Sequence, residues 1–395
     1  MTDDDYLPQD HESATLIGRV YDPSIGGPCI VHLRGDQLAD ITAAGPTVSA
    51  LLERDDLLSA VREVPTARSF PVAEVIANSL AGRRDAPYLL APCDLQAVKA
   101  CGVTFARSML ERVIEERARG DFRAAATIRV QISNAIGGQL RDLKPGSTEA
   151  ARAKEVLMEA GYWSQYLDVG IGPDAEVFTK AQPLSAVGFG ADIGVHPAST
   201  WNNPEPEIVL LVSSRGRIVG ATLGNDVNLR DVEGRSALLL SKAKDNNGST
   251  SIGPFVRLFD ERFSLDDIRK TDVALRVEGT DGFVLDGLSS MSRISRDPAD
   301  IVGQTVSAHH QYPDGFCLFL GTMFAPTQER AGGGGGFTHK PDDIVVIRSR
   351  HLGALVNRVR HTDQIPPWTF GVRALIANLA ARGLSEVAVT PKQGT

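Results

Sequence analysis

The sequence has few cysteines and no long apolar run. Its 395 residues include four cysteines, which are scattered and form no Cys-x-x-Cys pair. Neither a disulfide framework nor a zinc site is therefore indicated. No stretch approaches the roughly 18 apolar residues that a membrane span needs, and the acidic N-terminus lacks the apolar core of a signal peptide. We therefore expect a cytoplasmic protein with no membrane partner.

An excess of basic residues is also absent. Lysine and arginine total 41 against 49 aspartate and glutamate residues, which gives a formal net charge of −8. No basic stripe stands out, so nucleic acid is not an expected partner. The composition is that of an ordinary globular enzyme, with 42% hydrophobic and 23% charged residues. A chain of this length can bury a large core and divide into two or three domains.

The order of patterns along the chain predicts two domains and an α+β fold. Residues 1–88 alternate short apolar strands with turns and then show a helical stretch near 48–64, which indicates a small N-terminal domain. Residues 89–390 form the second predicted domain. It begins with a helix-rich insertion near 108–160, and from Phe178 onward it shows short strands with Gly, Asn and Asp turns. That pattern favours an antiparallel or mixed β-rich core.

One low-complexity run, Gly332 to Gly336, interrupts the second domain. It lacks the Lys-Ser or Lys-Thr that follows a phosphate-binding loop, so it is not a P-loop. A mobile lid and a disordered tip are both compatible with it.

Three carboxylates stand out as a candidate metal site. Glu205 and Glu207 open an apolar run that turns near Ser214 and returns along residues 218–223. This predicts a β-hairpin, on which positions two apart project from the same face. With the turn centred just after Ser214, position 207 faces 222, position 205 faces 224, and Asp226 emerges beside the glutamates.

Three convergent carboxylates without cysteine or histidine suit a hard divalent cation, Mg²⁺ or possibly Mn²⁺, that keeps positions open for substrate oxygens. The plainer interpretation is a polar start of a strand followed by an Asx turn at Asn225-Asp226. The convergence of all three residues favours the metal.

An ordered set of motifs resembles the fumarylacetoacetate hydrolase superfamily. The set comprises Phe178-Thr-Lys, the Glu-x-Glu at 205–207 with the following Asn-Asp-Val-x-x-Arg-Asp, Lys244 ten residues before a proline, and Leu320-Gly-Thr-Met. The resemblance implies a β-rich catalytic domain built as a mixed β-sheet roll, and a homo-oligomer. It also implies that Glu205, Glu207 and Asp226 bind the metal and that Lys244 is catalytic.

Longer segments are similar to the 2-keto-3-deoxypentonate dehydratases within that superfamily. These segments are Gly102-Val-Thr-Phe-Ala-Arg-Ser-Met, Trp201-Asn-Asn-Pro-Glu-Pro-Glu and His310-Gln-Tyr-Pro-Asp-Gly-Phe. The resemblance implies a metal-dependent lyase for a small sugar acid in non-phosphorylating pentose oxidation. It would convert 2-keto-3-deoxypentonate, derived from D-xylonate, D-arabonate or L-arabonate, to 2-oxoglutarate semialdehyde.

One departure from the superfamily separates the possible reactions. Its carbon–carbon hydrolases carry Asn-Tyr-x-x-His-x-x-Glu, and the matching positions here are Thr104, Phe105, Ser108 and Glu111. With serine in place of histidine, a hydrolytic water loses its base. Ser108 and Glu111 also fit a capping box that starts a helix. A 2,4-diketo acid hydrolase and a sugar-acid binding protein without turnover remain the alternatives.

The remaining roles follow from the dehydration chemistry. Lys244 could take the proton from C3 or stabilise an enolate as an ammonium, and Lys242 could compete for that role. Glu111, or Glu115 one turn later, could protonate the leaving hydroxyl. The candidate contacts to the substrate are Thr322, the backbone of Gly321, Ser290 and Arg107.

Overall fold

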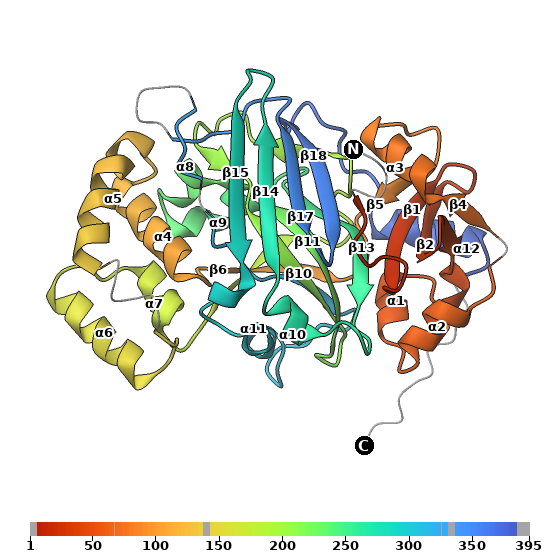
Figure 1. Cartoon of the computed structure of the whole chain (residues 1–395), viewed down its shortest axis with the longest axis horizontal. Coiled ribbons are helices and arrows are strands. Elements are labelled where there is room, and N and C mark those ends of the chain that lie inside the picture. Colours follow the sequence, from red (N-terminus) through yellow and green to blue (C-terminus); the bar gives the residue numbers. More distant parts are fainter. Residues whose placement is uncertain (1–5, 67, 137–142, 325, 331–335, 385–395) are drawn as a thin grey trace.

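The computed structural model describes residues 6–66, 68–136, 143–324, 326–330 and 336–384. β-Sheets form the centre of the molecule, a helical lobe lies on one side, and the N-terminal strands and helices lie on the other (Figure 1). Most of the glycine run at 332–336, for which a lid or a disordered tip was predicted, falls outside the described residues.

The main sheet runs through the whole molecule and contains eleven strands among the described residues. Most neighbouring strands are antiparallel, whereas β16 and β6 are parallel, which makes the sheet mixed, as predicted. In sheet order the strands are β4 (Ser69–Pro71), β3 (Gln37–Asp40), β2 (Gly27–Arg34), β1 (Leu16–Asp22), β13 (Thr250–Leu258), β11 (Ile218–Asp226), β10 (Pro206–Val212), β16 (Phe316–Phe319), β6 (Ala97–Gly102) and β7 (Glu176–Ala181), with β5 (Tyr88–Leu90) paired to β1.

The central strands of this sheet are buried on both faces. Every residue of β10 and of β13 is buried. A continuous apolar run such as Ile208–Val212 satisfies both faces at once, which explains why these strands do not alternate between apolar and polar residues. The metal-site sequence motif therefore sits at the end of one of the most buried strands of the fold.

The N-terminal residues contribute directly to this sheet. Strand β1 pairs with β2, β5 and β13, and its pairing with β13 joins residues 16–22 to the core. The helical stretch predicted near 48–64 forms two short helices, α1 (Val48–Leu52) and α2 (Leu57–Glu63), and α3 (Val72–Leu80) follows. A domain boundary near residue 88 stays a prediction.

A second sheet packs over the first and has five strands in the described part of the chain. Strand β14 alternates strictly between exposed and buried residues, so one face packs on the core and the other faces outward. The order is β15 (Val284–Ser290), β14 (Asp272–Glu278), β17 (Ile344–Ser349), β18 (Gly353–His361) and β8 (Asp192–Val195). A two-stranded ladder joins β9 (Asn202–Asn203) and β12 (Asn228–Leu229) beside the candidate site.

The predicted helix-rich insertion forms the lobe on the left of Figure 1. It contains α4 (Ala106–Ala118), α5 (Phe122–Ile136), α6 (Thr148–Glu159) and α7 (Gln165–Ile171). Met109, Val113 and Ala118 of α4 belong to an apolar cluster of this lobe. The same helix buries Glu111 and Glu115. Helix α4 therefore has one buried apolar face and one buried charged face, and the charged face borders the candidate site.

The other helices are short and connect or cover the sheets. They are α8 (Arg230–Glu233), α9 (Leu240–Lys244), α10 (Leu265–Ile268), α11 (Pro298–Thr305) and α12 (Val372–Ala381), with 3₁₀ segments at Thr42–Ala44, Ala237–Leu239 and Met291–Arg293. Helix α12 lies against the N-terminal strands, where Asn378 Nδ2 donates to the carbonyl of Ile25. Among the described residues, no helix combines the length and apolarity that crossing a membrane requires.

Candidate metal centre and active site

The predicted hairpin exists, but its register differs from the prediction. Glu207 pairs with Gly224 and not with position 222, and Val209 takes the place opposite Thr222. The predicted register was therefore wrong by two residues. Because side chains alternate with a period of two, a shift of two leaves each residue on its expected face. Asp226 still meets the glutamates, since its N–H donates to the carbonyl of Glu205 at 3.1 Å.

Two irregularities near the turn account for the shift. The Ser213 N–H donates to the carbonyl of Arg217, and Gly216 has a φ of +75°, which is a three-residue loop with a left-handed glycine. A β-bulge then follows between Leu211 and Val212. Each feature adds one residue to the returning strand, and apolar patterning does not reveal either of them.

The three predicted metal ligands converge in the structure. Glu205, Glu207 and Asp226 are all buried, and one carboxylate oxygen from each lies within 4.8 Å of the other two. Two lysines border the group. Lys244 Nζ lies 2.5 Å from Glu205 Oε2 and 3.1 Å from Asp226 Oδ2, and Lys180 Nζ lies 3.2 Å from Asp226 Oδ1. The structure therefore brings Lys244 directly onto two of the three carboxylates.

The charged side chains in this group shift one another's pKa values. Burial raises the pKa of Glu207, and the neighbouring carboxylates of Asp226 and Glu205 raise it further. For Glu205, burial is outweighed by Lys244 and Arg112, and its pKa is lowered. Burial lowers the pKa of Lys244, but Asp226 and Glu205 outweigh burial and raise it. Lys244 is therefore an ammonium ion in this state.

The residues present fit a divalent cation. The donors are hard carboxylate oxygens, which Mg²⁺ prefers, and none is a cysteine or histidine. Asp226 Oδ1 is buried and accepts no hydrogen bond of good geometry from the described residues. The cavity among these side chains measures about 30 Å³, which is room for one ion or water.

A ladder of alternating charges connects helix α4 to the metal ligands. Arg112 Nη2 donates to Glu205 Oε1 at 2.7 Å, and its Nη1 contacts Glu115 Oε2 and Glu233 Oε2, each at 2.6 Å. Arg230 Nη2 lies 2.6 Å from Glu115 Oε1 on the other side. This ladder holds Glu205 Oε1, while Lys244 holds Glu205 Oε2.

The ladder continues outward to the predicted catalytic residue Glu111. Arg129 donates to both oxygens of Glu111, at 2.8 and 2.7 Å, and Arg230 Nη2 lies 3.4 Å from Glu111 Oε2. Burial alone would raise the pKa of Glu111, but Arg129 and Arg230 outweigh it and lower the pKa. Glu111 borders the cavity as an ionised carboxylate, and its catalytic role stays a prediction.

The capping box predicted at Ser108 and Glu111 is wrong. Helix α4 begins at Ala106, two residues earlier, and its N-cap Phe105 makes no side-chain cap. Ser108 lies inside the first turn, where its Oγ donates to the carbonyl of Phe105 at 3.0 Å, and it borders the cavity. Glu111 is engaged by arginines and not by the helix start.

The four predicted substrate contacts fall in two groups. Gly321 and Thr322 line the cavity, and the Gly321 N–H donates to Glu207 Oε2 at 2.7 Å. Gly321 has a φ of +84°, and a Cβ there would lie 2.1 Å from Thr104 Oγ1, so the position requires glycine. Ser290 and Arg107 are not among the residues that line this cavity. Ser290 Oγ instead pairs with Ser292 Oγ.

Sequence reasoning missed Glu176, at the start of β7. Its carboxylate lies against Gly102, a residue of the cavity wall, so closely that a Cβ at 102 would be 2.2 Å from Glu176 Oε2. Burial and the neighbouring Glu233 raise the pKa of Glu176 to about 7. A carboxyl group that holds its proton near neutrality can act as an acid or a base. The position of Glu176 in the sequence, four residues before Lys180, did not indicate that its carboxyl group would be buried or that its pKa would be raised.

Comparison with known proteins agrees with this geometry. The family described as fumarylacetoacetate (FAA) hydrolase C-terminal matches residues 153–360, which is more than half of the chain. The chain belongs to this family. The predicted family resemblance is thereby confirmed, and the matched segment contains the three carboxylates, Lys180 and Lys244.

Two curated relatives share part of the sequence. A probable 2-keto-3-deoxyxylonate dehydratase of Haloferax volcanii is 32% identical over 212 residues, which is 54% of this chain and 68% of the relative. A 2-dehydro-3-deoxy-D-arabinonate dehydratase of Saccharolobus solfataricus is 29% identical over 190 residues, which is 48% of this chain and 60% of the relative. Dehydratases are lyases, and the predicted enzyme class agrees with both names.

The fold is shared with a solved structure. A 2-keto-3-deoxy-D-arabinonate dehydratase complexed with magnesium and 2,5-dioxopentanoate has a TM-score of 0.61 at 20% identity, over 88% of this chain and 99% of that chain. The predicted α+β fold with a fumarylacetoacetate-hydrolase-like catalytic domain is confirmed by this likeness.

Proposed function

We propose that this protein is a metal-dependent hydro-lyase that converts a 2-keto-3-deoxypentonate to 2-oxoglutarate semialdehyde. The observation that carries the proposal is the buried group of Glu205, Glu207 and Asp226 with Lys244 placed directly on it. The printed activities of the two curated relatives, both dehydratases of 2-keto-3-deoxy sugar acids, support the same reaction class. The substrate is a small sugar acid derived from xylonate or arabonate.

Glu205, Glu207 and Asp226 would hold the ion, for which we propose Mg²⁺. The ion would supply Lewis-acid polarisation of the C2 carbonyl, which makes the C3 proton more acidic. The reaction removes this proton and expels the C4 hydroxyl as water. A later proton transfer from C5 to C3 yields an enol at C4–C5, and movement of the hydroxyl proton from O5 to C4 then gives the aldehyde. The protein must therefore accept one proton near C3 and deliver one to the leaving oxygen.

Lys244 is the candidate for the base that accepts the proton from C3. Its raised pKa depends on Asp226 and Glu205, and burial acts in the opposite direction. When these carboxylates are engaged elsewhere, burial favours the neutral amine, which can accept a proton. Lys180 is less available, because its Nζ donates to the carbonyls of Lys244 and Ser249.

Glu176 is a second candidate for delivering a proton to the leaving hydroxyl, although it lies against Gly102 of the cavity wall and is not itself among the residues that line the cavity. Its pKa of about 7 keeps a proton on the carboxyl near neutrality. Glu111, which the sequence favoured for this role, is paired with Arg129 and has a lowered pKa. Glu111 then serves to hold helix α4 in place, the Gly321 N–H holds Glu207, and the Thr322 hydroxyl contacts the substrate carboxylate.

The rival reaction is hydrolysis of a 2,4-diketo acid on the same fold. It needs a base for water near Ser108, and the Ser108 hydroxyl is itself a donor to the Phe105 carbonyl. A sugar-acid binding protein would bind the keto acid without turnover.

The test is product formation from the D and L forms of 2-keto-3-deoxypentonate, with Mg²⁺ and after EDTA. A coupled NADP-linked semialdehyde dehydrogenase reports the product, and we expect a signal only with metal. Release of pyruvate from a 2,4-diketo acid, with no semialdehyde from either pentonate, would identify a hydrolase instead. Tight binding of the keto acid without any product would identify a binding protein.

A further inference from the structure

A cleft of about 920 Å³ lies beside the start of helix α4 and has charged side chains of only one sign. The charged residues that line it are Arg107, Lys144 and Arg293, and all three are exposed. Within the described residues, none of the three forms an ion pair or donates a side-chain hydrogen bond. Arg107 does help to lower the pKa of Glu111, from beyond ion-pair distance. The three positive charges are therefore open to a ligand.

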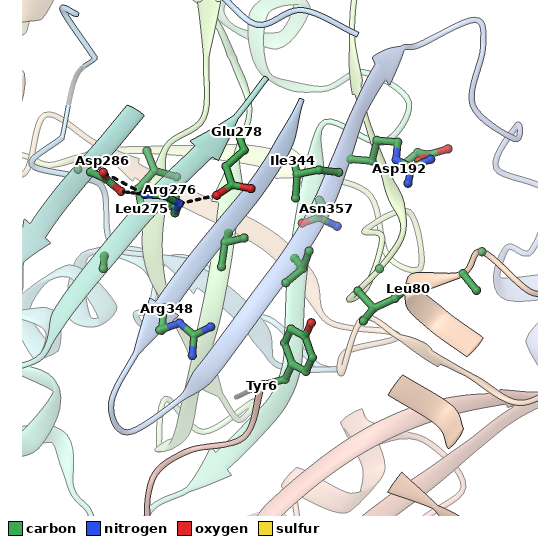
Figure 2. Close-up of a pocket in the computed structure, with 18 residues that line it drawn as sticks. Tyr6, Leu80, Asp192, Leu275, Arg276, Glu278, Asp286, Ile344, Arg348 and Asn357 are labelled. Atoms are coloured by element: carbon green, nitrogen blue, oxygen red, sulfur yellow. Dashed lines mark hydrogen bonds and ion pairs between the residues drawn. The ribbon is translucent and has the colours of Figure 1, made fainter. Parts of the chain in front are cut away.

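This concentration of positive charge stands out in a chain whose net charge is −8. The hollow over the second sheet offers a comparison, with a volume of about 730 Å³ (Figure 2). Its lining includes three arginines and three acidic residues, and Arg276 pairs with Glu278 at 2.6 Å and with Asp286 at 3.0 Å. A cleft lined by charges of one sign attracts ions of the opposite sign, whereas balanced charges do not. The cleft beside α4 therefore attracts anions.

The cleft and the metal cavity share a wall. The first turns of α4 form one part of this wall, in which Ser108 and Glu111 line the metal cavity. Arg107 and Leu110 of the same turns line the cleft. Successive residues of an α-helix point in directions about 100° apart, so one helix can present a different face to each cavity. Helix α4 thus lies between the positive cleft and the metal ligands.

The segment that follows β16 forms the other part of the wall. Thr322 and Phe324 line the metal cavity, and Met323 between them lines the cleft. The opposite side of the cleft is joined to the same region, because the Ser295 N–H donates to the carbonyl of Thr104 at 2.7 Å. A ligand in the cleft would therefore lie next to the wall that carries Thr322, the proposed contact to the substrate carboxylate.

The lining of the cleft fits a small organic carboxylate. Phe105, Leu110 and Met323 give it an apolar part, and Ser292 and Ser295 contribute hydroxyl groups. A guanidinium group can bind a carboxylate through two parallel hydrogen bonds, and serine hydroxyls can pair with the hydroxyls of a sugar acid. The volume lies within the range of roughly 300 to 1,000 Å³ that is typical of small-molecule sites. An inorganic anion would leave the apolar part uncovered.

We propose that this cleft is an outer binding site, which holds the sugar-acid anion before it reaches the metal cavity. The inference rests on the proposed function, because it takes the ligand to be the substrate, a 2-keto-3-deoxypentonate. Arg107, Lys144 and Arg293 attract the carboxylate and raise the local concentration of the substrate. The site also gives a role to Arg107, a predicted substrate contact that does not line the metal cavity.

Binding of D-xylonate in the presence of EDTA tests the site without turnover. D-Xylonate has the carboxylate and the hydroxyls but no 2-keto group, and EDTA removes the metal, so the titration reports the outer site. Ligand-observed NMR titrations of the full chain should show saturable binding that weakens as salt is added. In the double variant Lys144→Glu/Arg293→Glu we expect the dissociation constant to rise at least roughly 10-fold.

The matched control is Arg373→Glu on α12, which lies on the other side of the molecule from α4 (Figure 1). Arg373 is exposed, and its reversal changes the net charge as much as Arg293→Glu does. Arg293→Glu alone should weaken the binding of D-xylonate, Arg293→Lys should retain it, and Arg373→Glu should bind like the wild type. Circular dichroism melting curves verify that all variants fold.

Steady-state kinetics show whether the outer site serves the reaction. At low salt the double variant should lower kcat/KM for the 2-keto-3-deoxypentonate at least roughly 10-fold, mainly through KM, because saturating substrate reaches the metal cavity without prior capture. A wild type without turnover would refute the proposed function, and the D-xylonate titration would still decide whether the outer site exists.

Four results would overturn the outer site. The first is a wild type that shows no saturable binding of D-xylonate. Equal weakening by Arg373→Glu would reduce the effect to the overall charge of the protein. Inorganic phosphate that binds as tightly as D-xylonate would make the cleft a general anion site. An unchanged kcat/KM in the double variant would show that the bound anion does not proceed to the metal cavity.

Discussion

Lys244 Nζ and Glu205 Oε2 lie 2.5 Å apart in a buried ion pair at the centre of the candidate site. The same lysine lies 3.1 Å from Asp226 Oδ2, so it neutralises two of the residues that would hold the ion. Binding of a cation must therefore compete with Lys244 for these oxygens. This competition connects the state of the metal site to the ability of Lys244 to accept a proton.

Replacement of Lys244 by methionine should abolish most of the turnover. General acid–base groups contribute about 10²- to 10⁴-fold to enzymatic rates, and we expect a loss of kcat in that range. Lys242→Met is the matched control, because Lys242 is exposed on the same short helix. Steady-state assays with saturating Mg²⁺ check the prediction. Equal effects of the two substitutions would show that Lys244 has no special role.

Removal of the metal, or of one ligand, should lower the stability of the protein as well as its activity. Mg²⁺ at 100 times its dissociation constant should add about 2.7 kcal/mol to the free energy of unfolding. Asp226→Asn should lose this gain, because the amide cannot supply a charged oxygen. Asp245→Asn, at an exposed position beyond α9, should retain it. Thermal melts with Mg²⁺ and with EDTA check this, and a melting temperature insensitive to Mg²⁺ in the wild type would exclude the site.

The convergence of the three candidate metal ligands could be predicted from sequence, because it depends on short-range patterns. Glu205 and Glu207 precede a buried strand, and Asp226 ends its hairpin partner. The turn loop and the bulge at Leu211 shift the pairing of the two strands by two residues. A shift of two leaves each side chain on the face that was predicted for it. The location of the site therefore did not depend on the details of the turn.

Contacts between distant parts of the chain could not be predicted in this way. Arg112 reaches Glu205 across 93 positions, and Arg230 reaches Glu115 across 115. Nothing in the helical pattern of α4 distinguishes its buried glutamates from the solvated ones that amphipathic helices usually carry. The raised pKa of Glu176 likewise arises from burial beside Gly102, which only the packed structure reveals.

The pH dependence of turnover should report Glu176. If its carboxyl delivers the proton to the leaving hydroxyl, kcat should fall as the pH rises through about 7, where that carboxyl ionises. In Glu176→Gln this alkaline limb should disappear, and the remaining rate should be low at every pH. Rate measurements between pH 5 and 9 check the prediction. An alkaline limb that persists in Glu176→Gln would assign the ionisation to another group.

Glu176 should also make stability depend on pH. Its pKa is raised from 4.5 to about 7 on folding, so the folded protein holds the proton that the unfolded chain releases between these values. The contribution to stability is complete below pH 4.5 and is lost as the pH rises through 7. The free energy of unfolding of the wild type relative to Glu176→Gln should therefore decrease from pH 5 to pH 8. Glu159→Gln, at an exposed position of α6, should show no such trend against the wild type.

Arg230 should be the residue of the charge ladder whose loss costs most stability. Its side chain is 2% exposed, it lies 2.6 Å from Glu115, and its guanidinium stacks 4.2 Å from the ring of Trp201. Arg230→Met would leave buried carboxylates without this partner, at a cost of about 3 kcal/mol or more in the free energy of unfolding.

Arg129→Met is the comparison, because Arg129 is 29% exposed and its pair with Glu111 is partly solvated. We expect it to cost about 1 kcal/mol. Urea titrations measure both free energies of unfolding. Equal losses in Arg230→Met and Arg129→Met would mean that the burial of an arginine in the ladder does not determine how much it stabilises the protein.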